Sequence, residues 1–157
     1  MRLVLLVGYI WGIGFMPDVK RLFGYHGAEH KTINAYEAGA ELTPEVVAKY
    51  PIEHPRCGTA FMLTFVLLSI LIHSLLGDMT FVWRLASRIL LIPVIAGIAV
   101  EFIRWTANHL DSALVRLLIK PNLALQSLTT RQPDNSMLEV AIESFKTMRQ
   151  AEQEVVV

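Results

Sequence analysis

A segment near the N-terminus carries histidines and glutamates at a spacing that suits metal binding. It reads YHGAEHK from Tyr25 to Lys31, and Glu37 lies seven residues after the second histidine. In a helix, His26 and His30 lie four residues apart on one face, and Glu37 returns to that face two turns later. Imidazole nitrogens and carboxylate oxygens are ligands that zinc accepts. Glu29 could then act as a base toward water activated by the ion.

The pattern HxxEH occurs among zinc peptidases, although it fixes only three positions and also arises by chance. The alternative is a solvated helix in which the histidines and carboxylates form hydrogen bonds and weak pairs four residues apart. One feature departs from a peptidase. Glu37 follows the second histidine closely, whereas a third zinc ligand usually comes from a separate element.

A second polar block, PIEHPRCGT over residues 51–59, is rich in turn-forming residues and contains the only cysteine. His54 and Cys57 are candidate extra ligands, and Arg56 is a candidate for holding a carboxylate or phosphate of the substrate. A helix N-terminus and Arg56 would lower the pKa of the Cys57 thiol. The alternatives are an exposed loop position for His54 and a small packed side chain for Cys57.

Composition indicates one domain that faces lipid. The chain has 157 residues, of which 54% are hydrophobic, and its mean hydropathy is +0.46. This is more apolar than a soluble domain requires. The formal net charge is zero, so charge gives no reason to expect a nucleic-acid partner. A single cysteine excludes an internal disulfide and a cysteine-rich zinc fold.

Long apolar runs predict an all-α, membrane-embedded helical protein built around a transmembrane hairpin. Residues 58–77 contain no Asp, Glu, Lys or Arg, and twenty residues are enough to cross a bilayer. Residues 81–103 form a second candidate span, in which Pro93 should kink the helix. Residues 3–16 form a shorter apolar run that rises only about 21 Å as a helix, which predicts a membrane or interfacial helix.

The expected organisation is a single membrane-embedded domain over residues 1–157. It comprises an N-terminal membrane or interfacial helix (1–22), a cytoplasmic HxxEH segment (24–56), two transmembrane helices (58–77 and 81–103) and amphipathic C-terminal helices (105–157). Within the HxxEH segment a helix is expected from residue 24 to about residue 40, with Gly39 at its C-terminus.

Two amphipathic helices are predicted in the C-terminal part. The first covers 105–119, ends at Lys120-Pro121-Asn122 and places its leucines on one side: Leu110, Leu114, Leu117 and Leu118. The second runs from 136 to about 152, because Ser136 and Glu139 have the spacing of a capping box. Its apolar side contains Leu138, Ala141, Ile142, Phe145 and Met148.

Basic residues predict the topology. Lysines and arginines occur in 17–56 and after 103 but not in the connector 78–80, which places both flanking regions in the cytoplasm. Arg84 and Arg88, near the outer end, count against this. We therefore expect a multi-pass protein of the bacterial inner (cytoplasmic) membrane whose polar site faces the cytoplasm.

The hairpin should bring Cys57 and Glu101 to the same depth, beside the HxxEH segment. Glu101 is then a ligand or proton carrier, or simply the ion-pair partner of Arg104. His73 and His109 are expected to be hydrogen-bonded structural residues.

Four blocks in the same order resemble the YqhQ-like family, a group of bacterial and plastid membrane proteins described as candidate metal-dependent enzymes of unknown function. The blocks are YHGAEHKT from Tyr25, HPRCGT from His54, LIPVIAGI from Leu91 with Glu101, and LQSLTTRQP from Leu125 with EVAI from Glu139. The resemblance covers residues 20 to 145. It implies a membrane-embedded helical protein whose polar blocks form one metal site, and it implies no substrate.

The chain departs from that family in length, since the usual members are about twice as long and have a glycine-rich, polar N-terminal region. The expectation is a minimal member, a shortened form, or a chain completed by a partner. A short first helix and a hairpin leave lateral faces to cover, which predicts a homo-oligomer.

The leading functional hypothesis is a metal-dependent hydrolase at the cytoplasmic membrane interface. Its ion would be zinc, with iron or manganese as possibilities, and its substrate a lipid head group or a membrane-proximal peptide. The alternative is a non-catalytic scaffold or assembly factor with a structural metal or polar cluster. An ion or proton pathway through His73 and Glu101 is a third and weaker hypothesis.

Overall fold

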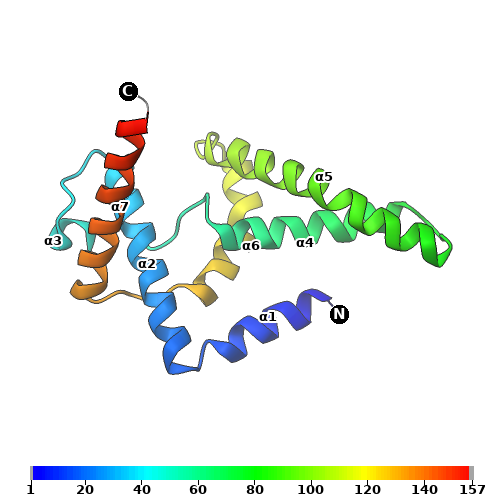
Figure 1. Ribbon diagram of the computed structural model, residues 1–157, viewed down its shortest axis with the longest axis horizontal. Coiled ribbons are helices and arrows are strands. Elements are labelled where there is room, and N and C mark those ends of the chain that lie inside the picture. The colour runs from blue at the N-terminus through cyan, green and yellow to red at the C-terminus, as the bar shows by residue number, and fades with distance from the viewer. Residues whose placement is uncertain (1, 156–157) are drawn as a thin grey trace. The chain divides into compact units, whose positions relative to one another are not determined.

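The computed structural model describes residues 2–155, and within them every regular element is a helix (Figure 1). The predicted all-α fold is confirmed. The chain divides into two compact units, Met1–His54 with Ser127–Val157, and Pro55–Gln126. The expectation of a single domain stays a prediction. The helices are α1 (Arg2–Ile13), α2 (Pro17–Glu37), α3 (Pro44–Val47), α4 (Gly58–Leu75), α5 (Phe81–Ala107), α6 (Ala113–Thr129) and α7 (Asn135–Val155).

The HxxEH segment lies on α2, the longest helix of the first unit together with α7. Pro17 starts α2 at a position where the missing N–H costs nothing. The helix therefore begins earlier than the predicted residue 24. It ends where Gly39 adopts a φ of +69° and the amide of Ala40 donates to the carbonyl of Ala35 at 3.0 Å. The sequence predicted this glycine as the helix C-terminus, and that prediction is confirmed.

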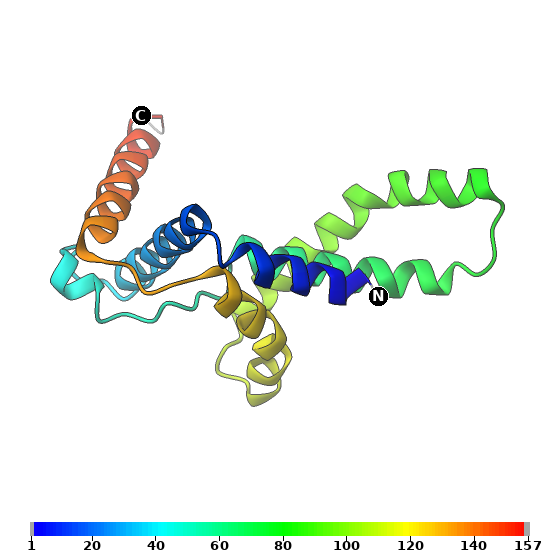
Figure 2. The same cartoon turned by 90° about the horizontal axis from the view of Figure 1, so that it is seen from below.

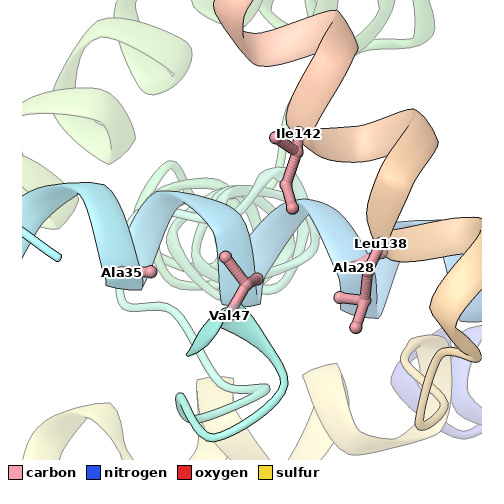
Figure 3. Packing of buried hydrophobic residues seen from close by; sticks show 5 residues of the cluster. All are labelled: Ala28, Ala35, Val47, Leu138 and Ile142. Carbon is pink, nitrogen blue, oxygen red and sulfur yellow. The ribbon is translucent and has the colours of Figure 1, made fainter. Parts of the chain in front are cut away.

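The core of the first unit forms where α2, α3 and α7 pack together (Figure 3). Ala28 and Ala35 on α2 are small, so Leu138 and Ile142 of α7 can approach the helix closely, and Val47 of α3 packs against the same cluster. The predicted apolar side of α7 is confirmed at Leu138 and Ile142, which are buried. Met148, at the far end of that side, is exposed.

The N-cap of α7 is Asp134 and not the predicted Ser136. The Oδ1 atom of Asp134 accepts a hydrogen bond from the amide of Met137 at 2.9 Å and from the hydroxyl of Ser136 at 2.7 Å. A carboxylate at this position satisfies an orphan amide and complements the helix dipole. The capping-box prediction was wrong because Asp134 precedes the serine and caps the helix better. The helix therefore starts at Asn135.

Acidification should weaken this cap. The hydroxyl of Ser136 and the amide of Met137 stabilise the carboxylate, which lowers the pKa of Asp134 below its ordinary 3.8. The stabilisation is therefore complete above the ordinary value and is lost as the pH falls through the lowered pKa. We expect thermal unfolding, followed by circular dichroism in detergent, to occur at a lower temperature in Asp134→Ala at pH 7, with the difference from wild type shrinking near pH 2. Asp134→Asn, which keeps an acceptor without titrating, should show a smaller defect at pH 7. Equal melting of wild type and Asp134→Ala at pH 7 would contradict this cap.

The second unit contains a hairpin of two apolar helices. Figure 2 shows α4 and α5 side by side, joined by the turn at residues 76–80. Both are long and apolar enough to cross a membrane, with Gly58–Leu75 and Phe81–Ala107 as the candidate spans. Only 17% of the most apolar window of each helix is buried within the protein. The remaining apolar surface is therefore suited to lipid.

The N-terminal apolar run is short, as predicted. It forms α1, and only together are Leu3–Ile13 and Pro17–Glu37 long and apolar enough to cross a membrane, with a bend of 101° between them. Such a pair corresponds to a broken span or a re-entrant segment.

The region after the hairpin differs from the prediction. The second span continues to Ala107, and a separate helix, α6, runs straight through Pro121. The predicted stop at Lys120-Pro121-Asn122 was wrong. The amide of Asn122 donates to the hydroxyl of Thr64 at 3.2 Å, and buried residues flank the proline, so packing holds the helix where local propensity would end it.

The predicted leucine side of this region stays exposed. Leu114, Leu117 and Leu118 are exposed, whereas Val115 and Ile119 are buried. The face of α6 that packs within the second unit is therefore turned by about one residue from the leucines, whose side chains stay available to lipid.

Candidate metal centre

His26 and His30 stack against each other on one face of α2. Their ring centroids lie 4.3 Å apart in an edge-on arrangement, and their ligand nitrogens lie within 4.8 Å of one another. The prediction that the two imidazoles share a helix face is therefore confirmed. A divalent ion could be held by both without moving the backbone.

Backbone carbonyls fix the orientation and the tautomer of both rings. The Nδ1 atom of His26 lies 2.9 Å from the carbonyl oxygen of Thr129, and the Nδ1 atom of His30 lies 2.7 Å from that of Ile52. A carbonyl oxygen only accepts, so Nδ1 must carry the hydrogen in each ring. The lone pair of each neutral imidazole is therefore on Nε2. Metal-binding histidines usually donate their second ring nitrogen in this way.

His54 and Glu37 adjoin this pair within the same unit. The rings of His30 and His54 have centroids 5.8 Å apart, and the Nε2 atom of His54 lies 3.6 Å from a carboxylate oxygen of Glu37. His54 is 4% exposed, so the expectation that it is an exposed loop residue was wrong. Three imidazoles and one carboxylate thus gather on one side of α2.

The other predicted site residues differ in their burial. Glu29 is exposed on α2, and Arg56 is exposed just before α4. Cys57 belongs to the second unit, where it is buried and its sulfur accepts a hydrogen bond from the amide of Thr59 at 3.3 Å. Glu101 pairs with Arg104 at 3.2 Å, and both are exposed. The catalytic roles of Glu29 and Arg56 and the ligand role of Cys57 stay predictions.

The two remaining histidines have local partners, as expected for structural residues. The Nδ1 atom of His73 lies 2.7 Å from the carbonyl oxygen of Ser69, one turn earlier in α4, and that of His109 lies 2.7 Å from the carbonyl oxygen of Trp105 in the last turn of α5.

Sequence reasoning missed two polar residues that position the site. The Nζ atom of Lys31 donates to the carbonyls of Ala48 and Tyr50 at 2.9 and 2.6 Å. The amide of Asn34 donates to the carbonyls of Pro51 and Glu53, both at 2.9 Å. With His30, these residues hold the loop that leads to His54. The signal was available, because an irregular segment that packs on a helix needs donors for its carbonyls.

Gly27 was also missed as a site residue. A Cβ atom at this position would collide with the carbonyl oxygen of Arg131 and would lie 2.8 Å from Cδ1 of Ile52. The amide of Arg131 donates to the carbonyl of Phe23 at 2.9 Å. Glycine therefore lets the chain after α6 lie directly on the backbone of α2. That contact places the carbonyl of Thr129 within reach of His26.

Lys31, next to His30 on α2, is a charged residue that is buried. Burial lowers the pKa of Lys31, and Glu53 partly opposes this shift. The lysine is directed at loop carbonyls, which favour the ammonium form. The donor set beside it consists of three imidazoles and a half-exposed carboxylate, which is chemistry that suits a divalent cation.

The fold and this cluster define a class of protein: an all-α protein with two helices able to span a membrane and with a histidine-rich polar cluster that could hold a metal. The chain belongs to the family described as "Protein of unknown function (DUF1385)", whose model matches residues 1–151. It is 40% identical over 151 residues to "Uncharacterized protein YqhQ" of Bacillus subtilis (strain 168). The resemblance to the YqhQ-like family is thereby confirmed.

That match covers 96% of this chain and 48% of the relative, so the chain spans about half the length of the curated relative that it matches. No solved structure matches the chain.

Proposed function

We propose that this protein is a metal-dependent hydrolase of the bacterial inner membrane. His26 and His30 bind a divalent ion, for which zinc is the best fit, and Glu37 and His54 complete or support the site. The substrate is a lipid head group or a membrane-proximal peptide at the cytoplasmic surface. The positive-inside distribution of lysine and arginine supports this orientation.

The observation that carries the proposal is the pair of hydrogen bonds from Nδ1 of His26 and His30 to backbone carbonyls. Each ring is held in the tautomer that presents Nε2 to an ion, and two such rings stack on one helix face. The contact between His54 and Glu37 resembles the carboxylate–histidine pairs that support metal sites.

In this proposal Glu29 and Arg56 supply the chemistry beside the ion. Glu29, on the exposed side of the helix that carries both ligands, accepts a proton from the attacking water. Arg56 holds an anionic group of the substrate. Self-association through the exposed apolar faces of the hairpin is part of the same proposal.

A second candidate, a non-catalytic scaffold, is favoured by the loop contacts. His30 is buried, and with Lys31 and Asn34 it holds the carbonyls of residues 48–53. The same cluster therefore also ties a loop to α2. In this second candidate the metal or polar cluster has a structural role only.

Metal analysis tests whether His26 and His30 bind an ion. We expect wild-type protein, purified in detergent without chelator, to contain stoichiometric zinc or a similar ion and His26→Ala to lose most of it, because one of two anchored imidazoles is gone. His109→Ala is the matched control, since His109 is exposed and its side chain bonds to the carbonyl of Trp105, four residues earlier. Circular dichroism should show that both variants fold. Wild-type protein without bound metal, after reconstitution with each candidate ion, would contradict both metal-based proposals.

Cobalt substitution then distinguishes the enzyme from the scaffold and tests the thiol. Cobalt in a site with an open position should change its visible spectrum when a hydroxamate is added, whereas a closed four-ligand site should not respond. If Cys57 is a ligand, a sulfur-to-cobalt charge-transfer band should be present and should vanish in Cys57→Ser. Absence of that band in wild type would remove Cys57 from the ligand set.

A further inference from the structure

The turn end of the α4/α5 hairpin holds a polar pocket and an apolar pocket that share a wall. The polar pocket has a volume of about 230 Å³, and the apolar pocket has a volume of about 650 Å³. Four residues line both: Leu76, Asp78, Met79 and Ser87. All of these residues belong to the second unit. Adjoining polar and apolar spaces suit a ligand with a charged head and an apolar tail.

The side chains that line the polar pocket carry a net positive charge. Arg84 and Arg88 line it from one face of α5, four residues apart, and Asp78 is the one acidic residue of its described lining. With His73 neutral, the formal charge of the lining is therefore +1. No ion pair joins Asp78 to either arginine among the described residues. Arg84 donates only to the carbonyl of Met79 at 3.1 Å, so both guanidinium groups keep donors for an anion.

A histidine in the same lining also lacks a partner on one nitrogen. Nδ1 of His73 lies 2.7 Å from the carbonyl of Ser69 and therefore carries the hydrogen. Nε2 is shielded from solvent and has no hydrogen-bond partner among the described residues. His73 therefore adds an unpaired buried nitrogen to the lining of the polar pocket.

Position in the membrane selects a lipid over a free ion. Helix α4 has 18 residues and rises about 27 Å, which places its end at the level of the lipid head groups. Trp83, 69% exposed, lines the apolar pocket beside Leu90 and Leu91. Tryptophan at this depth is typical of the membrane interface.

We propose that the turn end of this hairpin binds one anionic phospholipid, with its phosphate on Arg84 and Arg88 and an acyl chain in the adjoining apolar pocket. A single negative phosphodiester neutralises the charge of the lining. A zwitterionic head group would leave that charge uncompensated near a low-dielectric phase. This site is separate from the candidate metal centre and does not depend on it.

Native mass spectrometry of the detergent-purified full chain tests the proposal with added phosphatidylglycerol, phosphatidylethanolamine, diacylglycerol and inorganic phosphate. We expect phosphatidylglycerol to bind about tenfold more tightly than phosphatidylethanolamine, which corresponds to the loss of one charge-assisted contact. Diacylglycerol and inorganic phosphate should bind weakly, since each offers only half of the ligand. Equal binding of both phospholipids, or tight binding of inorganic phosphate alone, would overturn the assignment.

Variants locate the site. Arg84→Gln with Arg88→Gln should abolish the preference for phosphatidylglycerol. Ala86→Phe should weaken binding of that lipid while leaving both arginines in place, because Ala86 lines the apolar pocket only. Arg104→Gln removes an exposed arginine at the other end of α5 and should have no effect. A loss of preference in Arg104→Gln equal to that in the double variant, or undiminished binding in Ala86→Phe, would refute the proposal.

Discussion

Gly27→Ala is expected to lower the free energy of unfolding of the first unit by about 3 kcal/mol, the upper part of the range for overpacking a core. The new methyl group would collide with the carbonyl oxygen of Arg131, a backbone atom of a residue whose amide is held by its hydrogen bond to the carbonyl of Phe23. It would also lie 2.8 Å from Cδ1 of Ile52. The side chain of Ile52 can turn aside, but the carbonyl of Arg131 cannot retreat without lifting the chain after α6 from α2. The gain in helix propensity from alanine, about 1 kcal/mol, is too small to compensate.

Gly24→Ala is the matched control, one turn away on the same helix. Its Cβ atom would meet the sulfur of Met137 at 2.6 Å, but methionine is flexible and can turn aside. We expect this variant to change stability by about 1 kcal/mol or less, because helix propensity offsets the repacking. Chemical unfolding in detergent, followed by circular dichroism, measures both. Equal effects of the two substitutions would show that the chain after α6 is not docked on Gly27.

The same substitution has a consequence for the metal site. Displacing Arg131 moves the carbonyl of Thr129, which holds Nδ1 of His26. If the proposed site is correct, Gly27→Ala should weaken metal binding about tenfold or more, as loss of an outer-shell hydrogen bond does. Gly24→Ala should retain the metal. If the Gly27→Ala protein kept wild-type metal affinity, the contact of Arg131 with α2 would not be needed for metal binding.

Local sequence signals predicted the elements well where one rule decided the outcome. The spacing of His26 and His30 fixes their shared face whenever the segment is helical, and it does so here. Gly39 ended α2 as expected because a positive φ favours glycine. The two charge-free runs became the two helices able to span a membrane.

Prediction failed where a distant contact or a better competitor decided the outcome. Pro121 should have ended a helix, but packing around it and the contact of Asn122 with Thr64 carry α6 onward. Ser136 had the right spacing for a cap, but Asp134 stood two residues earlier with a charged acceptor. Asx capping and tertiary packing are not visible in a period or a motif.

The candidate site shows the same limit. Motif spacing found the two stacked imidazoles, but it gave no reason to expect that Lys31 and Asn34 would hold the loop carrying His54. It also placed His54 in solvent, whereas the loop buries it. Some side chains of this segment could hold an ion, and others hold a loop. Motif spacing alone does not distinguish the two roles.

Lys31→Met tests how strongly Lys31 holds the loop of residues 48–53 on α2. It is the second large effect that we expect. The substitution keeps an unbranched apolar stem but removes both hydrogen bonds to the carbonyls of Ala48 and Tyr50. Hydrogen bonds from a charged donor are worth roughly 1.5–3 kcal/mol each. Burial of the ammonium group is unfavourable, as the lowered pKa of Lys31 indicates. Removing that buried charge offsets part of the loss. We therefore expect a net destabilisation of about 2–4 kcal/mol.

Lys49→Met is the control, because Lys49 is exposed and lies within the fastened loop region. It removes the same charge and should change stability by less than about 0.5 kcal/mol. Limited proteolysis at residues 48–53 should then cut Lys31→Met faster than either wild type or Lys49→Met, since the loop is released from α2. If both lysine variants unfold and are cleaved alike, the loop is held by His30 and Asn34 without Lys31. Faster cleavage in Lys31→Met alone, with metal still bound, would instead show that the loop can open while His26 and His30 keep their ion.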